Sequence, residues 1–388
     1  MRVPVGDFPI GKEERTTISR VLDSGHISEG LETRSFEEEF ASYLGVKHCV
    51  AVSSGTMALM VALKATEYAG LIPSHARVLI PAFTFVADAN AIELCGMTPV
   101  FGDIYAQTFC LRPTSVIGKN VDLVLPVHIL GYCAPMTSFR LFAEKESPHL
   151  LVAEDAAEAL GSVHNNRKVG TFGLWSIFSF YIAHTIQVGE MGCICTSNDE
   201  IARICRSIKA HGRLCDCKRC VRQEGKCPRL EENPRFTAQY IGFNAKTMEF
   251  QAALARLQLK HIEENIAKRK RNFSLLKAAL APLENNGIAP IYEQEGMVPI
   301  AFPVVLQREG IRNKVIAELE RRGVECRNFF ASIPTQQPAY AKYKKQYKGK
   351  LPVSDWCGAN GFYVGCHQYL TESEVEFIGK QIVEAIGG

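Results

Sequence analysis

Short apolar runs alternate with helix-forming stretches along the first half of this chain, and this alternation limits the fold more than any other feature. The run HCVAV (48–52) precedes the helical stretch MALMVALKAT, and RVLIP (77–81) precedes AFTFVADANAIELCG. Further candidates for buried strands are PVFGDI (99–104), DLVLPVHI (122–129), HLLVAED (149–155) and WSIFSF (175–180). Buried strands separated by helices are typical of a mostly parallel sheet covered on both faces. The sequence therefore predicts an α/β fold.

The strand and helix pattern changes after about residue 212. Residues 212–235 are rich in cysteine and charge and have little apolar periodicity, so we expect an insertion or long loop. Helical spacing resumes over 247–272, and short strand patterns followed by IRNKVIAELERRG predict a smaller α+β unit beyond it. The expected domains are 1–272, a large domain with the N-terminal segment and the insertion, and 273–388, a small C-terminal domain.

Length and charge exclude several classes of protein. A chain of 388 residues is long enough for two such domains. Its formal net charge of +3 is too close to balance to indicate a nucleic-acid partner or a membrane surface. No apolar run approaches the roughly 18 residues that span a bilayer, and the first residues lack the apolar core of a secretory signal. We expect a cytoplasmic protein that binds neither nucleic acid nor membranes.

Two positions at predicted strand ends can hold a ligand. The turn SSGT (53–56) joins a strand to a helix, and free N–H groups at a helix start suit a phosphate, although such turns are common without any ligand. Asp155 follows an apolar strand, where α/β sheets gather ligands. Its carboxylate can pair with a ring nitrogen or cap the next helix. These residues alone leave both interpretations open.

Seven local patterns then follow one another in the order and spacing of a known family. They are GHISEG (25–30), SSGTMAL (53–59), PAFTFVADANAI (81–92), PVHILG (126–131), AEDAAEALGS (153–162), VGTFG (169–173) and IGFNAKTMEFQAALARLQL (241–259). From near residue 5 to the C-terminus the chain resembles the DegT/DnrJ/EryC1/StrS family of sugar-nucleotide aminotransferases and dehydratases. The resemblance implies the fold-type I architecture of pyridoxal-phosphate enzymes and a homodimer with active sites shared across its interface.

The resemblance also implies a role for individual residues. The expected contacts, in chain order, are Gly55 and Thr56 with the cofactor phosphate, Phe85 stacked on the pyridine ring, Asp155 with the pyridine nitrogen, Glu158 beside the ring, Ser179 with the phosphate, Asn244 with the phosphate in the neighbouring subunit, and Arg327 with the substrate. An aspartate that keeps the ring nitrogen protonated makes the ring an electron sink.

One position departs from the aminotransferases of this family. Their Schiff-base lysine follows a Ser-Phe pair by a few residues, whereas FSFYIAHTIQVGEMG places His184 there. The nearest lysines, Lys168 and Lys209, lie outside the motif, and we expect them on the surface. Without the amine the cofactor has no usual covalent anchor, but an imidazole can still move protons near neutral pH. The chain thereby resembles the 3-dehydratase branch, which holds pyridoxamine phosphate (PMP) freely.

The 14 cysteines fall into two groups. Most are scattered in apolar stretches, as Cys49, Cys193 and Cys195 are, and we expect small buried hydrophobes. The clustered ones are Cys215, Cys217, Cys220 and Cys227. Four cysteines so close together can hold an iron–sulfur cluster, [2Fe–2S] or [4Fe–4S], or a structural zinc ion. A subgroup of the 3-dehydratase branch carries a cluster in this region, although the cysteine that it draws from the segment DAAEA is missing here.

The sequence thus predicts a PMP-dependent 3-dehydratase that acts on a nucleotide-linked 4-keto-6-deoxyhexose. His184 replaces the lysine, and an iron–sulfur cluster delivers electrons from a separate reductase. Two alternatives stay open. One is a dehydratase with a zinc loop whose cofactor is regenerated from glutamate, and the other is a non-catalytic paralogue that binds the cofactor or a sugar nucleotide.

Overall fold

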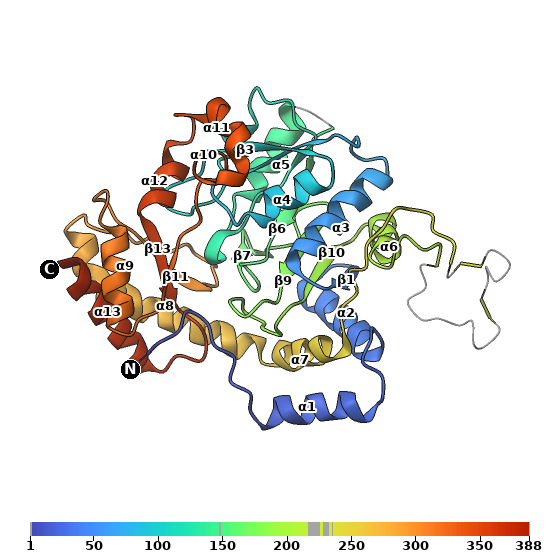
Figure 1. Cartoon of the computed structure of the whole chain (residues 1–388), viewed down its shortest axis with the longest axis horizontal. Coiled ribbons are helices and arrows are strands. Elements are labelled where there is room, and N and C mark those ends of the chain that lie inside the picture. Colours follow the sequence, from blue (N-terminus) through green and yellow to red (C-terminus); the bar gives the residue numbers. More distant parts are fainter. Residues whose placement is uncertain (1, 147–148, 216–225, 228–232, 235, 388) are drawn as a thin grey trace.

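A central sheet with helices on both faces forms the larger part of the molecule, and a small antiparallel sheet lies toward the C-terminus (Figure 1). The computed structural model describes residues 2–146, 149–215, 226–227, 233–234 and 236–387. The α-helices are α1 (Lys12–Asp23), α2 (Leu31–Leu44), α3 (Gly55–Tyr68), α4 (Ala87–Leu94), α5 (Met136–Glu146), α6 (Asp199–Ile208), α7 (Glu249–Lys260), α8 (Ile262–Asn285), α9 (Arg312–Arg321), α10 (Ile333–Gln336), α11 (Ala341–Tyr347), α12 (Pro352–Asn360) and α13 (Glu372–Gly387). The strands are β1 (His48–Val52), β2 (Arg77–Pro81), β3 (Thr98–Gly102), β4 (Leu123–Val124), β5 (Leu151–Val152), β6 (Glu154–Asp155), β7 (Val163–His164), β8 (Arg167–Lys168), β9 (Ser176–Ser179), β10 (Gly192–Thr196), β11 (Ala301–Val305), β12 (Cys326–Asn328) and β13 (Gly361–Gly365).

The extended segment 151–155 joins two sets of strands into the central sheet. One set has the order β3-β2-β4-β5 with every pair parallel, and the other has the order β1-β10-β9-β6. At the junction Ala153 N donates to Val124 O at 3.0 Å, and Glu154 N donates to Trp175 O at 3.0 Å. Strand β10 runs antiparallel to both of its neighbours, whereas β6 and β9 are parallel. The mostly parallel α/β sheet predicted from the sequence is confirmed.

Alternate side chains of β1 enter different parts of the core, because successive residues of a strand point to opposite faces. Cys49 and Ala51 pack in a cluster that contains aromatic residues of α2, whereas Val50 and Val52 pack in a cluster that contains residues of α3 and α6. Helices α2 and α7 therefore cover one face of this half of the sheet, and α3 and α6 cover the other.

The C-terminal part contains an antiparallel sheet with the order β11-β13-β12. Helices α8 and α13 pack against each other, and α9 packs on α13 and on the strands. The start of the chain also reaches this part: Val3 N donates to Gly323 O at 2.8 Å, and Val3 O accepts from Glu325 N at 3.0 Å. The exact division between 1–272 and 273–388 stays a prediction.

The long helix expected over 247–272 is instead two helices. His261 has φ −100° and ψ 12° and separates α7 from α8. Helix α8 then continues beyond the expected end because Leu276, Leu280 and Leu283 are buried in the core. A uniform helical pattern in the sequence carried no sign of this break.

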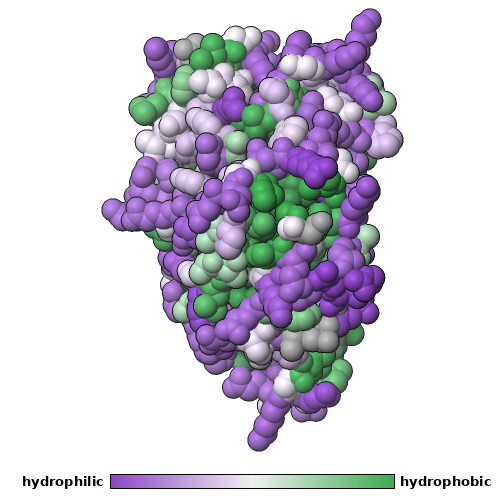
Figure 2. Space-filling model, turned by 90° about the vertical axis from the view of Figure 1, so that its left-hand side faces the viewer, coloured by the Kyte–Doolittle hydropathy of each residue, from purple (hydrophilic) through white to green (hydrophobic). Residues whose placement is uncertain are grey.

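Hydrophilic side chains cover most of the face shown in Figure 2 and surround an apolar region near its centre. Among the helices of the described residues, none has both the length and the apolar character that crossing a bilayer requires.

Candidate active site

A cavity of about 490 Å³ lies at the carboxyl ends of the parallel strands. Ligands gather at this edge in open α/β sheets, because the loops that leave the strands converge there. Eight residues expected at the active site line it together: Gly55, Thr56, Phe85, Asp155, Glu158, Ser179, His184 and Arg327. The small C-terminal part contributes Arg327 from β12 and Tyr363 from β13, so the cavity lies where the two parts meet.

The start of α3 forms a polar turn at one end of the cavity. Ser54 caps the helix by accepting a hydrogen bond from Met57 N at 3.1 Å, which leaves the N–H groups of Gly55 and Thr56 at an open helix start. A Cβ on Gly55 would lie 2.8 Å from the Cβ of Ser179, so glycine is needed for this close approach. The hydroxyl of Ser179 thereby lies next to the positive end of the helix dipole. This arrangement suits a phosphate.

Two carboxyl groups are in contact on the buried side of the cavity. Asp155, at the end of β6, accepts from Ala157 N at 2.8 Å, and its carboxyl group lies beside that of Asp88 of α4. Burial and the neighbouring Asp155 raise the pKa of Asp88 well above its ordinary value, and burial also raises the pKa of Asp155. Thr84 donates to one Asp88 oxygen at 2.8 Å, but Asp88 Oδ1 is buried without a donor. Both shifts mean that folding favours a proton on this pair.

Glu158 adds a third carboxyl group to this part of the cavity. Leu130 N donates to Glu158 Oε2 at 2.8 Å. Burial nevertheless raises the pKa of Glu158 to about 8, so this side chain is mostly protonated at neutral pH and can donate a hydrogen bond.

His184 lies in the loop between β9 and β10. Burial and the nearby Arg269 guanidinium lower the pKa of His184 to about 3, so its imidazole is neutral over the physiological range. Its Nδ1 atom is buried, and no residue in the described part of the chain is a hydrogen-bond partner for it. Three side chains hold the loop backbone: Arg269 and Gln187 donate to His184 O at 2.9 and 3.0 Å, and Gln258 Oε1 accepts from Gln187 N at 2.9 Å. A neutral imidazole held in this way can accept a proton.

Phe85 and Arg327 lie at the more open side of the cavity. The Phe85 side chain is 59% exposed and contacts the Phe330 ring at a centroid distance of 6.1 Å. Arg327 Nε lies 3.8 Å from Glu325 Oε1, in a partly exposed pair that leaves the guanidinium accessible from the cavity. An exposed aromatic ring and a cation at the entrance can contact a bound ring and an anionic group.

Other expected site residues lie elsewhere. Asn244 is exposed and does not line the cavity in this chain, and its contact with the phosphate in a neighbouring subunit stays a prediction. Cys215 and Cys227 are partly exposed, whereas Cys217 and Cys220 lie outside the described residues.

One expectation about the lysines is wrong. Lys209 is not on the surface but 4% exposed, because its ammonium group binds Glu29, Glu37 and the Ala51 carbonyl. Lys168 is partly buried and donates to Tyr43 O. Neither lysine reaches the cavity, and no lysine occurs among the described residues that line it.

Sequence reasoning missed Asp88, Thr84 and Tyr181, which also line the cavity. A usable signal existed for Asp88, since an aspartate in the otherwise apolar stretch FVADANAI implies a buried partner. Tyr181 gave no such signal. Its ring lies 6.4 Å from the His184 ring in an edge-on arrangement that only the folded loop shows.

The described residues fit a pyridoxal-type cofactor. The glycine at position 55 leaves room at an open helix start, Asp155 offers a buried carboxylate, and His184 lines the cavity with a neutral imidazole. These three features match, in turn, a phosphate, a ring nitrogen and a proton-bearing carbon of such a cofactor. The described residues that line the cavity include no lysine that could bind the cofactor covalently.

The fold and the cavity have the fold-type I architecture of pyridoxal-phosphate-dependent enzymes. The chain belongs to the DegT/DnrJ/EryC1/StrS aminotransferase family, whose model matches residues 9–383. It is 30% identical over 382 residues to a GDP-perosamine synthase of Caulobacter vibrioides, covering 97% of this chain and 96% of that protein. It is 27% identical over 395 residues to a dTDP-4-dehydro-2,6-dideoxy-D-glucose 3-dehydratase of Saccharopolyspora spinosa, covering 97% of this chain and 85% of that protein. The structure of an aminotransferase from Psychrobacter cryohalolentis superposes with a TM-score of 0.87 at 27% identity, covering 99% of this chain and all of that chain.

Proposed function

We propose that this chain is a PMP-dependent 3-dehydratase that acts on a nucleotide-linked 4-keto-6-deoxyhexose. The observation that carries the proposal is His184, whose neutral imidazole lines the cavity in the place where transaminating relatives have a lysine. The likeness to a 3-dehydratase of Saccharopolyspora spinosa supports the reaction type, whereas the likeness to GDP-perosamine synthase supports a sugar-nucleotide substrate.

Different residues of the chain would bind the cofactor, move the proton and bind the substrate. Gly55, Thr56 and Ser179 would hold the cofactor phosphate, and Asp155 would keep the ring nitrogen protonated. Bound PMP supplies an amine for the 4-keto group and an electron sink for the elimination. His184, neutral because its pKa is low, accepts the proton whose removal drives loss of the C3 hydroxyl. Arg327 is placed to bind the substrate at the entrance.

The first test asks whether the cofactor is held without a covalent bond. Borohydride treatment of the protein loaded with pyridoxal phosphate (PLP) should leave no pyridoxyl group on the wild-type chain, because no lysine lines the cavity in the described residues. A His184→Lys variant should become labelled at position 184, as peptide mass spectrometry would show. Labelling of the wild-type chain at any cavity residue would contradict the proposal.

The second test asks for the reaction itself. Protein loaded with PMP is incubated with nucleotide-linked 4-keto-6-deoxyhexoses, and loss of the C3 hydroxyl is followed by NMR. His184→Asn should lower the rate by at least about 100-fold while leaving cofactor binding intact, since it removes the general base. His75→Asn is the matched control, because His75 is exposed and lies away from the cavity. An aminated product without loss of the hydroxyl would show transamination instead.

We further propose that the loop of Cys215, Cys217, Cys220 and Cys227 holds an iron–sulfur cluster that receives electrons from a separate reductase. This part rests on the sequence, because Cys217 and Cys220 lie outside the described residues. Anaerobically purified protein should contain iron and acid-labile sulfide, and Cys217→Ser should lose both. Stoichiometric zinc without sulfide would instead support the structural loop and regeneration of the cofactor from glutamate.

We propose that the chain acts as a homodimer. Asn244 supports this, because it is exposed and lies outside the cavity of its own chain, so it could contact a cofactor phosphate only in a second copy. Sedimentation velocity should give the mass of two chains, and a monomer that binds PMP with full affinity would contradict a shared site.

A further inference from the structure

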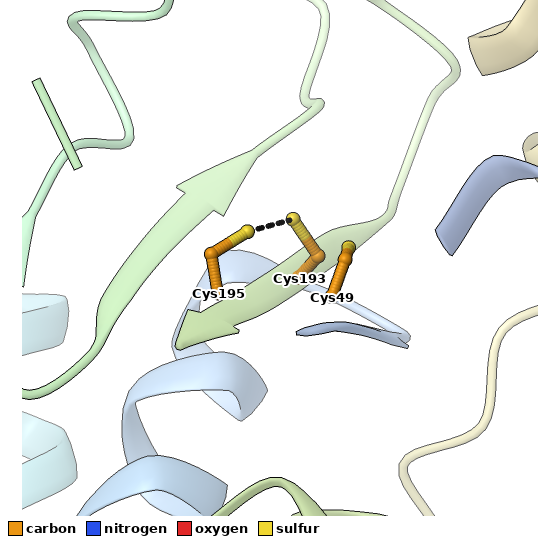
Figure 3. Close-up of side chains that lie close together, drawn as sticks. All are labelled: Cys49, Cys193 and Cys195. Atoms are coloured by element: carbon orange, nitrogen blue, oxygen red, sulfur yellow. Dashed lines mark hydrogen bonds between the residues drawn. The ribbon is translucent and has the colours of Figure 1, made fainter. Parts of the chain in front are cut away.

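Three cysteines that are distant in the sequence meet on one face of the central sheet. Cys49 belongs to β1, and Cys193 and Cys195 belong to the neighbouring strand β10. The antiparallel register pairs Cys49 directly with Cys195, and Cys193 is two residues along the same strand, so all three side chains point to the face under α2. Figure 3 shows the three side chains next to one another, with the thiols of Cys193 and Cys195 joined by a contact of 3.8 Å.

The spacing of the sulfur atoms fits one metal ion. All three lie within 4.8 Å of one another, and among the described residues no other group of three histidine, cysteine or acidic ligands meets this condition. An ion bound at about 2.3 Å from each of three sulfurs in a plane places those sulfurs about 4.0 Å apart. The Cys193–Cys195 distance of 3.8 Å is close to this value before any adjustment of the side chains.

The ligand type and the surroundings of the three cysteines limit which metal ions can bind there. Thiolate sulfur is a soft ligand that prefers Cu(I), Zn(II) and related ions over Mg(II) or Ca(II). The three cysteines are no more than 2% exposed and lie among aromatic and aliphatic side chains, so water is excluded and a hard, hydrated ion is disfavoured.

A cavity beside β1 reaches one of the three cysteines. This cavity of about 270 Å³ is lined by Cys49 together with Arg34, Lys47 and Arg206. Arg206 Nε is buried and has no hydrogen-bond partner among the described residues. Glu37 and Glu38 line the same cavity, so its cations and carboxylates are mixed.

From this geometry we propose that Cys49, Cys193 and Cys195 form a binding site for a soft metal ion held by three thiolates. Binding of Cd(II) or Zn(II) forms three metal–sulfur bonds, breaks three S–H bonds and releases three protons to solvent, with no change in oxidation state. The bound ion would fasten β1 to β10. Ser54 and Gly55 follow β1, and Gly192 begins β10 and lies against them, so the ion would stabilise the strands that support the phosphate turn.

The test uses Cd(II) as the probe, because its bonds to thiolates absorb in the ultraviolet. The parent protein is a variant in which all four loop cysteines, from Cys215 to Cys227, are serine, so that the loop cannot contribute. We expect this parent to bind one equivalent of Cd(II), with three sulfur neighbours by X-ray absorption spectroscopy. Cys193→Ser and Cys195→Ser, made in the parent, should each weaken binding by more than about 100-fold, since even outer-shell changes cost 10- to 100-fold.

Cys205→Ser is the matched control, because Cys205 is a buried cysteine of α6 outside the group and its loss should leave binding unchanged. The coordination number of the parent decides the proposal even if a triad variant does not fold. No tight binding, a number of sulfur neighbours other than three, or a disulfide among the three cysteines in the purified protein would overturn it. Dehydratase activity is not measured, so the outcome is independent of the proposed function.

Discussion

At the scale of single residues, the carboxyl pair of Asp88 and Asp155 has the clearest energetic consequence. The raised pKa of Asp88 means that folding favours its protonated form. The stability that this gives is fully present below the unfolded pKa of about 3.9 and is lost as pH rises through the folded pKa. A neutral amide in the same place would not have to lose a proton.

We therefore expect Asp88→Asn to flatten the pH dependence of stability. Relative to the wild-type protein, its free energy of unfolding should increase by about 1–3 kcal/mol between pH 5 and pH 8, as urea denaturation at the two pH values would show. Glu376→Gln is the control, since Glu376 is exposed. Parallel pH profiles for the wild type and Asp88→Asn would mean that the pair holds no shared proton.

For His184, the effect of pH on stability has the opposite sign to that of Asp88. Its folded pKa of about 3 lies below the unfolded value of about 6.5. Between these two pH values the unfolded chain binds a proton at His184 and the folded chain does not. Stability should decrease as pH falls below 6.5, and His184→Asn should remove about 1–2 kcal/mol of that decrease between pH 7 and pH 5. In the wild-type protein the His184 ring should show no titration above pH 5 by NMR, whereas a midpoint near 6.5 would be inconsistent with a neutral base.

At the scale of elements, the start of α3 depends on two close approaches. A Cβ on Gly55 would lie 2.8 Å from the Cβ of Ser179, and a Cβ on Gly192 would lie 2.6 Å from the backbone of Ser54 and Gly55. We expect Gly55→Ala to push β9 away from the helix start and to weaken PMP binding by about 10- to 100-fold, or about 1.4–2.8 kcal/mol. Equilibrium dialysis with PMP measures this loss.

Gly11→Ala is the matched control for that substitution. Gly11 has no positive φ, and the atom that its new Cβ would meet is the flexible end of Glu14, 3.0 Å away. Unchanged PMP affinity in Gly55→Ala would show that the helix start does not hold the phosphate.

Elements were predictable from the sequence where the signal is local. The strands at 48–52 and 77–81 were predicted within the bounds of β1 and β2, because each is a short apolar run between turn residues. The family pattern also brought Gly55, Asp155 and His184 to one cavity. By contrast, the break at His261 depends on packing against other elements, so no local pattern marked it.

Pairing between distant strands was outside the reach of local patterns. Cys49, Cys193 and Cys195 each looked like an isolated apolar cysteine, and burial of all three is confirmed. The three side chains meet only in the observed register of β1 against β10. A shift of one residue would turn the Cys49 side chain to the other face of the sheet.

At the scale of the whole molecule, Arg269 of α8 connects the small C-terminal part with the loop of His184. Its side chain is fully buried and donates to His184 O at 2.9 Å, to Ile300 O at 3.0 Å and to Gln368 Oε1 at 2.7 Å. Its known partners are neutral oxygens, and burial lowers the pKa of the guanidinium to about 10. The dipoles of these three oxygens stabilise the positive charge of Arg269. One side chain therefore fixes the relative positions of the segments that contain His184, Ile300 and Gln368.

Arg269→Met should therefore have two effects that occur together. The carbonyl oxygens of His184 and Ile300 lose their donor, so the free energy of unfolding should fall by about 3 kcal/mol in urea denaturation. Loss of the positive charge should also raise the pKa of His184 toward 6.5, because that charge is one of the two causes that lower it. NMR titration of the His184 ring measures the second effect.

Arg271→Met is the matched control on the same helix, since Arg271 is exposed and should change stability by less than about 1 kcal/mol. A destabilised Arg269→Met protein whose His184 pKa stays low would show that Arg269 only supports the fold. A raised pKa would show that the Arg269 charge helps to keep the proposed base neutral.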